Sequence, residues 1–168
     1  MIAHIFKTYF LPLLPSLLTI LGWYIVYKRD NTSKANTIHN KRIEAAQKTI
    51  DEIAASAKTY YSYSGSDEEA KKLEPILTTS LQKLGVYISL VSDQLKDDGQ
   101  KRDLEINFIE FRKIISGGNF GTLSRQKIGV DNQLYNDINM ISNDLFLSLE
   151  NNLKELKFPE SSSYEWAI

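Results

Sequence analysis

Residue types that build chemical sites are scarce in this chain of 168 residues, which has no Cys and only two His. Without Cys, the sequence excludes disulfides, thiolate zinc sites and iron–sulfur clusters. Ligation of a metal by His needs more than His4 and His39, and neither a His-Glu-x-x-His nor a paired Glu-x-x-His pattern is present. We therefore expect neither a metal nor a cofactor.

An excess of charge of one sign is also lacking, since 20 Lys and Arg face 21 Asp and Glu. The net charge of −1 argues against a nucleic-acid partner bound by global charge, because such domains are usually strongly basic. The hydrophobic fraction of 42% argues against wholesale disorder.

No catalytic motif is recognisable. The segment Gly117–Gly121 lacks the Gly-Lys-Ser/Thr of a phosphate loop, and no strand is expected before it. The acids of 67–69 and 97–98 stand where helix starts and turns place carboxylates at the surface. A general acid–base pair needs a partly dry pocket, and no pattern predicts one. We therefore expect no catalytic residue and no enzyme.

What the chain does have is one long apolar run, the 20 uncharged residues from Thr8 to Tyr27. A helix of that length spans about 30 Å, the thickness of the hydrocarbon core of a bilayer. No Ala-x-Ala cleavage pattern follows the run and it has no charged face, so a signal peptide and a surface helix are disfavoured. We predict a transmembrane anchor over residues 1–30, with interface residues Tyr9, Trp23, Tyr24, Tyr27, Lys28 and Arg29.

The cations around this run predict its orientation. Only Lys7 precedes it, whereas five cations lie in residues 28–42, which have a net charge of +4. Residues 43–168 contain 14 cations and 20 acids, a net charge of −6. Because cations favour the cytoplasmic side, we expect a short N-terminus outside and the remaining chain in the cytoplasm, at the inner membrane of a bacterium.

The remaining chain predicts helices over about 33–61, 66–96 and 101–115, and from Asp131 onward. No alternation of period two is sustained, so strands are not expected. The first helix has apolar residues at coiled-coil spacing from Ile43 to Tyr60. We predict an all-α fold: the N-terminal transmembrane helix, then an antiparallel bundle of about four helices over residues 31–158, with a stalk-like first helix.

Local signals refine this picture. Ser66 and Glu69 match a capping box, Asp131 is a plausible N-cap, and Pro75 predicts a kink or a restart. A short helical turn is allowed over 123–127. We expect His39 to be an exposed residue of the stalk, and we expect Tyr60, Tyr61 and Tyr63 to pack rather than to stack on bases or sugars.

The tail, residues 159–168, holds an aromatic pair after a Pro and Ser linker. Aromatic residues on chain ends commonly anchor in a partner, and packing on the chain's own bundle is an equal alternative. The partner-binding candidates are Tyr164, Trp166 and Ile168.

Three features together resemble those of a group of small bacterial and phage proteins: the segment 22–26 (Gly-Trp-Tyr-Ile-Val), the basic stretch through Lys41 and Arg42, and a Phe-Gly loop at Phe120 and Gly121. In that group, a single N-terminal span carries a helical cytosolic domain. The resemblance implies a topology and no activity.

These patterns favour a membrane-anchored module for protein–protein interaction, a subunit of a membrane-associated complex such as one for phage exclusion or defence. The expected partners are the lipid bilayer and either further copies of the chain or another protein. The alternative is a membrane-perturbing effector or channel subunit that oligomerises through Ser16, Thr19 and Gly22, small residues three apart.

Overall fold

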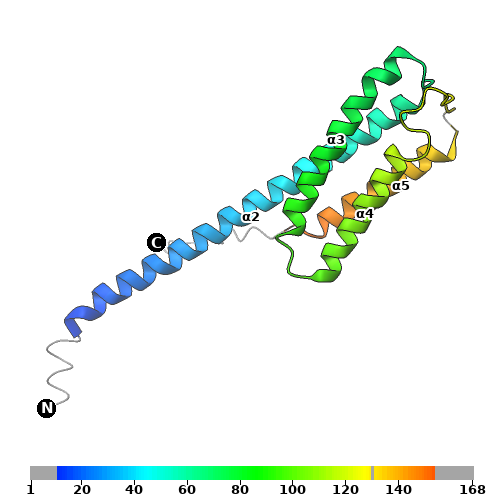
Figure 1. Ribbon diagram of the computed structural model, residues 1–168. Coiled ribbons are helices and arrows are strands. Elements are labelled where there is room, and N and C mark those ends of the chain that lie inside the picture. The colour runs from blue at the N-terminus through cyan, green and yellow to red at the C-terminus, as the bar shows by residue number, and fades with distance from the viewer. Residues whose placement is uncertain (1–10, 130, 154–168) are drawn as a thin grey trace, which may run out of the picture. The chain divides into compact units, whose positions relative to one another are not determined.

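The computed structural model describes residues 11–129 and 131–153 (Figure 1). These residues form four helices and no strand: α2 (Leu11–Tyr61), α3 (Glu68–Ser92), α4 (Asp98–Ser116) and α5 (Gln133–Glu150). The predicted all-helical class is confirmed. The chain divides into two compact units, of which the larger is His39–Lys154.

The larger unit is an antiparallel bundle of four helices. Figure 1 shows the directions, and hydrogen bonds join neighbouring helices: Ser92 of α3 donates to Glu105 of α4, and Asn107 of α4 donates to Ser148 of α5. Lys58 near the end of α2 donates to Asn139 in the first half of α5. Short connections after α2 and α3 fit this up-and-down order.

The bundle core is built from one apolar stripe on each helix. The predicted stripe of α2 is confirmed, since Ile43, Ile50 and Ile53 are fully buried. Full burial of such a side chain stabilises the fold by about 1.5–3 kcal/mol. The other fully buried aliphatic or aromatic side chains among the described residues are Ala46, Ala57 and Tyr60 of α2, Ala70, Leu77, Leu84 and Val91 of α3, Leu104, Phe111 and Ile115 of α4, and Ile138, Leu145 and Leu149 of α5.

The predicted start of α3 is wrong in detail. Its N-cap is Asp67 rather than Ser66, and the Asp67 Oδ2 accepts a hydrogen bond from the Ser64 N–H at 2.8 Å instead of capping the helix. The carboxylate therefore closes the preceding turn, and the predicted capping box does not form. α3 also continues through Pro75 without a restart.

The starts of α4 and α5 follow the side chains that cap them. Asp97 Oδ1 accepts from the backbone N–H groups of Gly99 and Gln100, so α4 begins at Asp98 rather than near residue 101. The N-cap of α5 is Asn132, whose Oδ1 accepts from the Leu134 N–H at 3.0 Å, rather than the predicted Asp131. Residues 123–127 form no helix, and only a single turn at 123–124 is closed, by the hydrogen bond from Arg125 N–H to Thr122 O at 3.3 Å.

His39 is buried, which corrects the prediction of an exposed residue. Its Nδ1 lies 2.9 Å from Gln94 Oε1, and its Nε2 lies 3.0 Å from the backbone oxygen of Asn152. The backbone oxygen of Asn152 can only accept, so this hydrogen bond forms in the tautomer with a hydrogen on Nε2. His39 continues the spacing of the buried apolar residues of α2. It can be buried there because both of its ring nitrogens have hydrogen-bond partners.

In the part of the chain that the structure describes, no helix combines the length and the apolar character needed to cross a bilayer. The predicted transmembrane helix therefore lacks support there. Residues 8–10, the first three of the predicted span, lie outside the described residues.

Candidate functional site

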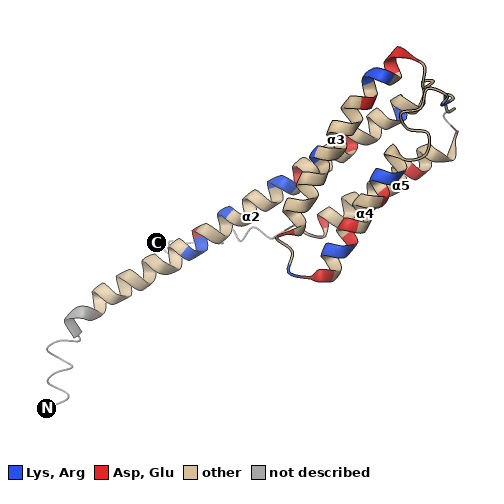
Figure 2. Cartoon of the chain, in the orientation of Figure 1, with Lys and Arg blue, Asp and Glu red and all other residues tan. Residues whose placement is uncertain are grey.

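The N-terminal half of α2 carries a dense set of exposed apolar side chains. Figure 2 shows this stretch without charge, followed by the first cations of the helix. Because consecutive residues 23–27 are all more than half exposed, the apolar surface runs around the whole helix. The exposed fractions lie between 40% and 76% for Leu14, Leu17, Leu18, Ile20, Leu21, Trp23, Tyr24, Ile25, Val26 and Tyr27.

A short basic collar, Lys28 and Arg29, follows this apolar segment. Neither residue forms an ion pair within the described chain, whereas Asp30 pairs with Lys34 at 2.7 Å. The hydrogen bond from Lys34 to Asp30 raises the pKa of the Lys34 ammonium. The two cations nearest the apolar segment therefore have no carboxylate partner among the described residues.

The structure brings five of the predicted site residues together on α2. Trp23, Tyr24, Tyr27, Lys28 and Arg29 follow one another at the end of the apolar segment, and all are exposed. The remaining candidates, Tyr9, Tyr164, Trp166 and Ile168, lie outside the described residues.

A second apolar surface is a groove of about 450 Å³ between α3 and α4. Val86 and Leu90 line one side of it, and Phe108 lines the other. The ring of Phe108 fits there because Gly85 has no side chain: a Cβ at Gly85 would lie 3.2 Å from Phe108. Arg112 lies in the same groove and adds a cation, and neutral polar groups come from Thr78, Gln82, Ser89 and Ser116.

The C-terminal end of α2 is closed by Arg125, a residue that the sequence patterns do not single out. Its Nη1 donates to the backbone oxygens of Tyr60 and Tyr63, at 3.1 and 3.0 Å. The guanidinium also lies over the Tyr60 ring. The last carbonyls of a helix lack partners within the helix and carry a partial negative charge. The buried Arg125 therefore both donates hydrogen bonds at this end and places a positive charge beside it.

Tyr60 and Tyr61 anchor the loop after α4 onto this end, which confirms that both tyrosines pack. The Tyr60 hydroxyl accepts from the Gly121 N–H and donates to Glu74, each at 3.0 Å. The Tyr61 hydroxyl donates to the Ile115 backbone oxygen at 2.9 Å. Burial raises the pKa of both phenols, that of Tyr61 to about 12.

Two of the buried polar residues, His39 and Arg125, differ in how clearly the sequence marks them as buried. His39 stands one step before Ile43 in the spacing of the α2 stripe, and this register is the signal that could have placed it in the core. Arg125 stands in an irregular loop, where no periodicity marks a buried position.

Among the described residues, no group of three or more His, Cys, Asp or Glu side chains could hold a metal ion. Comparisons with protein-family models, with curated proteins and with solved structures found no match. The resemblance to small membrane-anchored bacterial and phage proteins therefore stays a prediction.

Proposed function

We propose that this chain is a membrane-anchored helical module, in which the segment from Thr8 to Tyr27 inserts into a bilayer and the bundle makes contacts with proteins. The observation that carries the proposal is the exposed apolar surface of residues 14–27, which runs around the whole helix. A bundle neighbour could cover one face only, whereas lipid covers all faces.

The collar supports the same assignment. Trp23, Tyr24 and Tyr27 are residue types enriched at the level of lipid headgroups. Lys28 and Arg29 follow them without a carboxylate partner in the described chain, as suits the cytoplasmic side of an anionic membrane. In this topology the bundle lies in the cytoplasm of a bacterium.

The bundle supports a role in protein contact rather than catalysis. The groove between α3 and α4 presents Val86, Leu90 and Phe108 beside Arg112, a combination of apolar and Arg surface typical of interface centres. A subunit of a membrane-associated complex, built from further copies or from a partner protein, uses such a surface. Phage exclusion or defence is one setting for such a complex.

The membrane part is tested by expressing the full chain in bacteria and extracting the membranes with alkaline carbonate. We expect the wild-type chain to stay in the pellet. The double variant Leu18→Asp with Leu21→Asp should move to the supernatant, because each charge in the apolar core costs about 2.5–3.5 kcal/mol.

The control is Ile109→Asp, which places one Asp on an apolar residue of α4 that is 62% exposed. This variant should stay in the pellet with the wild-type chain. Release of the wild-type chain by carbonate would contradict the proposal. Crosslinked species larger than a monomer, lost in a Val86→Asp variant, would support the contact role, and a strictly monomeric membrane protein would contradict self-association.

A further inference from the structure

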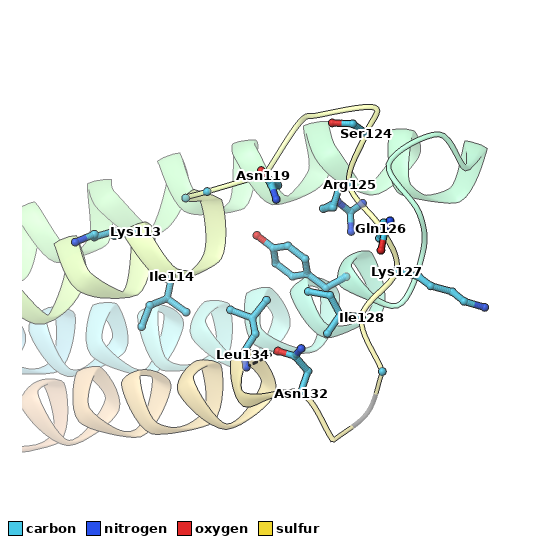
Figure 3. Close-up of a pocket in the computed structure, with 14 residues that line it drawn as sticks. Lys113, Ile114, Asn119, Ser124, Arg125, Gln126, Lys127, Ile128, Asn132 and Leu134 are labelled. Carbon is cyan, nitrogen blue, oxygen red and sulfur yellow. Dashed lines mark hydrogen bonds between the residues drawn. The ribbon is translucent and has the colours of Figure 1, made fainter.

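The bundle contains a large pocket at the end where α4 finishes and α5 begins (Figure 3). Its volume of about 770 Å³ lies within the roughly 300–1,000 Å³ that small-molecule sites occupy. Tyr61, Ile114 and Leu134 form an apolar side of the pocket, and Asn119, Ser124 and Gln126 contribute polar groups. The pocket can therefore hold a molecule with both apolar and polar parts.

The charge of the lining is of one sign. Lys113, Arg125 and Lys127 line the pocket, and no Asp or Glu of the described residues does. This lining departs from the composition of residues 43–168, where acids outnumber cations by 20 to 14. Three cations without a carboxylate, in an acidic part of the chain, favour an anionic ligand.

Arg125 provides an independent observation, because the residue is only 3% exposed and its Nε and Nη2 atoms are buried. Nη1 is bonded to two carbonyl oxygens, whereas Nε and Nη2 have no hydrogen-bond partner among the described residues. No carboxylate of the described chain pairs with it. A buried charge of this kind is costly unless it is compensated, and an anion in the adjoining pocket would add to the compensation.

The N-terminal end of α5 lies at the pocket and also favours a negatively charged ligand. Asn132, the N-cap of α5, and Leu134 in its first turn both line the pocket, and the first turn of α5 contains no acid. The N-terminal end of a helix carries a partial positive charge that favours anions. In Figure 3 the Arg125 side chain points inward from the loop, while the flexible side chains of Lys113 and Lys127 extend away from the pocket on its two sides.

We propose that this pocket binds a small molecule that bears a phosphate group. The phosphate lies toward Arg125 and the start of α5, where Lys113 and Lys127 turn in from the two sides to contact it. The remaining part of the molecule lies against Tyr61, Ile114 and Leu134. A phosphate fits better than a single carboxylate because its two negative charges meet three cations and a helix N-terminus.

The test uses the full chain in non-ionic detergent micelles and measures thermal unfolding with three probes: inorganic pyrophosphate, AMP and adenosine. A ligand that binds the folded state raises the unfolding temperature in proportion to the logarithm of its concentration over Kd. We expect AMP to raise it and adenosine, which has no phosphate, to leave it unchanged. A response to AMP but not to pyrophosphate indicates an organic phosphate, and a response to both indicates that the phosphate alone suffices.

Lys113→Gln and Lys127→Gln give the decisive comparison, because both side chains are exposed and their loss should leave the fold intact. Each should weaken binding by about tenfold, the loss of one charge-assisted contact. Lys48→Gln on α2 changes the net charge equally, away from the pocket, and should bind as the wild type does. No thermal shift with any phosphate compound at millimolar concentration would overturn the proposal, as would unchanged affinity in the Lys113 and Lys127 double variant.

Discussion

The guanidinium carbon of Arg125 lies 3.9 Å from the centre of the Tyr60 ring, and the same guanidinium bonds the Tyr60 backbone oxygen. One side chain therefore engages both the ring and the carbonyl of a residue that is 65 positions away in sequence. The cation–π contact and the charge-assisted hydrogen bonds act together where α2 ends. Arg125 is thus the residue on which the end of α2 and the following loop depend.

Replacement of Arg125 by Gln should lower the free energy of unfolding by about 2–4 kcal/mol, because the Tyr60 and Tyr63 carbonyls lose their donor and the Tyr60 ring loses its cation. The measurement is urea unfolding of the full chain in non-ionic micelles. Arg102→Gln, at an exposed position of α4, is the control and should change stability by less than about 0.5 kcal/mol. Equal midpoints for the two variants would contradict the role given to Arg125.

Gly65→Ala should destabilise the bundle by about 2 kcal/mol or more, since an added Cβ would lie 2.0 Å from the Thr122 backbone oxygen. The matched control is Gly129→Ala, where nothing lies within 4 Å of the added Cβ. This control should be neutral or stabilise by up to about 1 kcal/mol, through the lower entropy of the unfolded chain. Thermal unfolding of the two variants side by side distinguishes a steric effect from a general loss of glycine.

His39→Leu should cost about 2 kcal/mol, because Gln94 and the Asn152 carbonyl lose their partner at a buried position. The loss is local, so we also expect faster hydrogen exchange at the backbone amides from His39 to Ile43. Glu44→Leu, on the exposed side of the same helix, is the control. Unchanged exchange in the His39 variant would show that the histidine merely fills space.

The bundle should lose stability between about pH 10 and 12. Burial raises the pKa of Tyr61 from 10.0 to about 12. Since the folded state favours the protonated phenol, its contribution is complete below the unfolded pKa and is lost as the pH rises toward the folded value. Urea midpoints measured across this range should fall, and less steeply in Tyr61→Phe. Tyr87→Phe should keep the wild-type slope.

The sequence predicts the helical class and the core well, because both depend on spacing that is local in the chain. The apolar positions of α2 from Ile43 to Tyr60 follow that spacing, and the sequence predicts that they are buried. The burial of His39, one step earlier in the same spacing, was not predicted. Helix starts were harder, since Asp67 and Asn132 have neighbours of similar capping ability. Which of two adjacent side chains caps a helix depends on the turn before it.

The position of Arg125 at the C-terminal end of α2 could not be predicted, because it depends on contacts between residues that are distant in sequence. Arg125 is one cation among 20 Lys and Arg, in a loop without periodicity. Its burial follows from the position of the loop across the end of α2, which backbone bonds such as Gly65 N–H to Arg125 O, at 2.8 Å, maintain. The pocket could not be predicted either, because its cations come from two separate segments, α4 and that loop.

At each end of the buried part of α2, a hydrogen bond is formed with a residue that is synthesised much later than the helix. Asn152 follows His39 by 113 positions, and Arg125 follows Tyr60 by 65. At about 5–20 residues per second, Asn152 leaves the ribosome roughly 6–25 s after Tyr27. During this interval the apolar segment is already exposed while the bundle cannot yet close. The membrane insertion proposed for this segment would therefore have time to begin before the bundle folds.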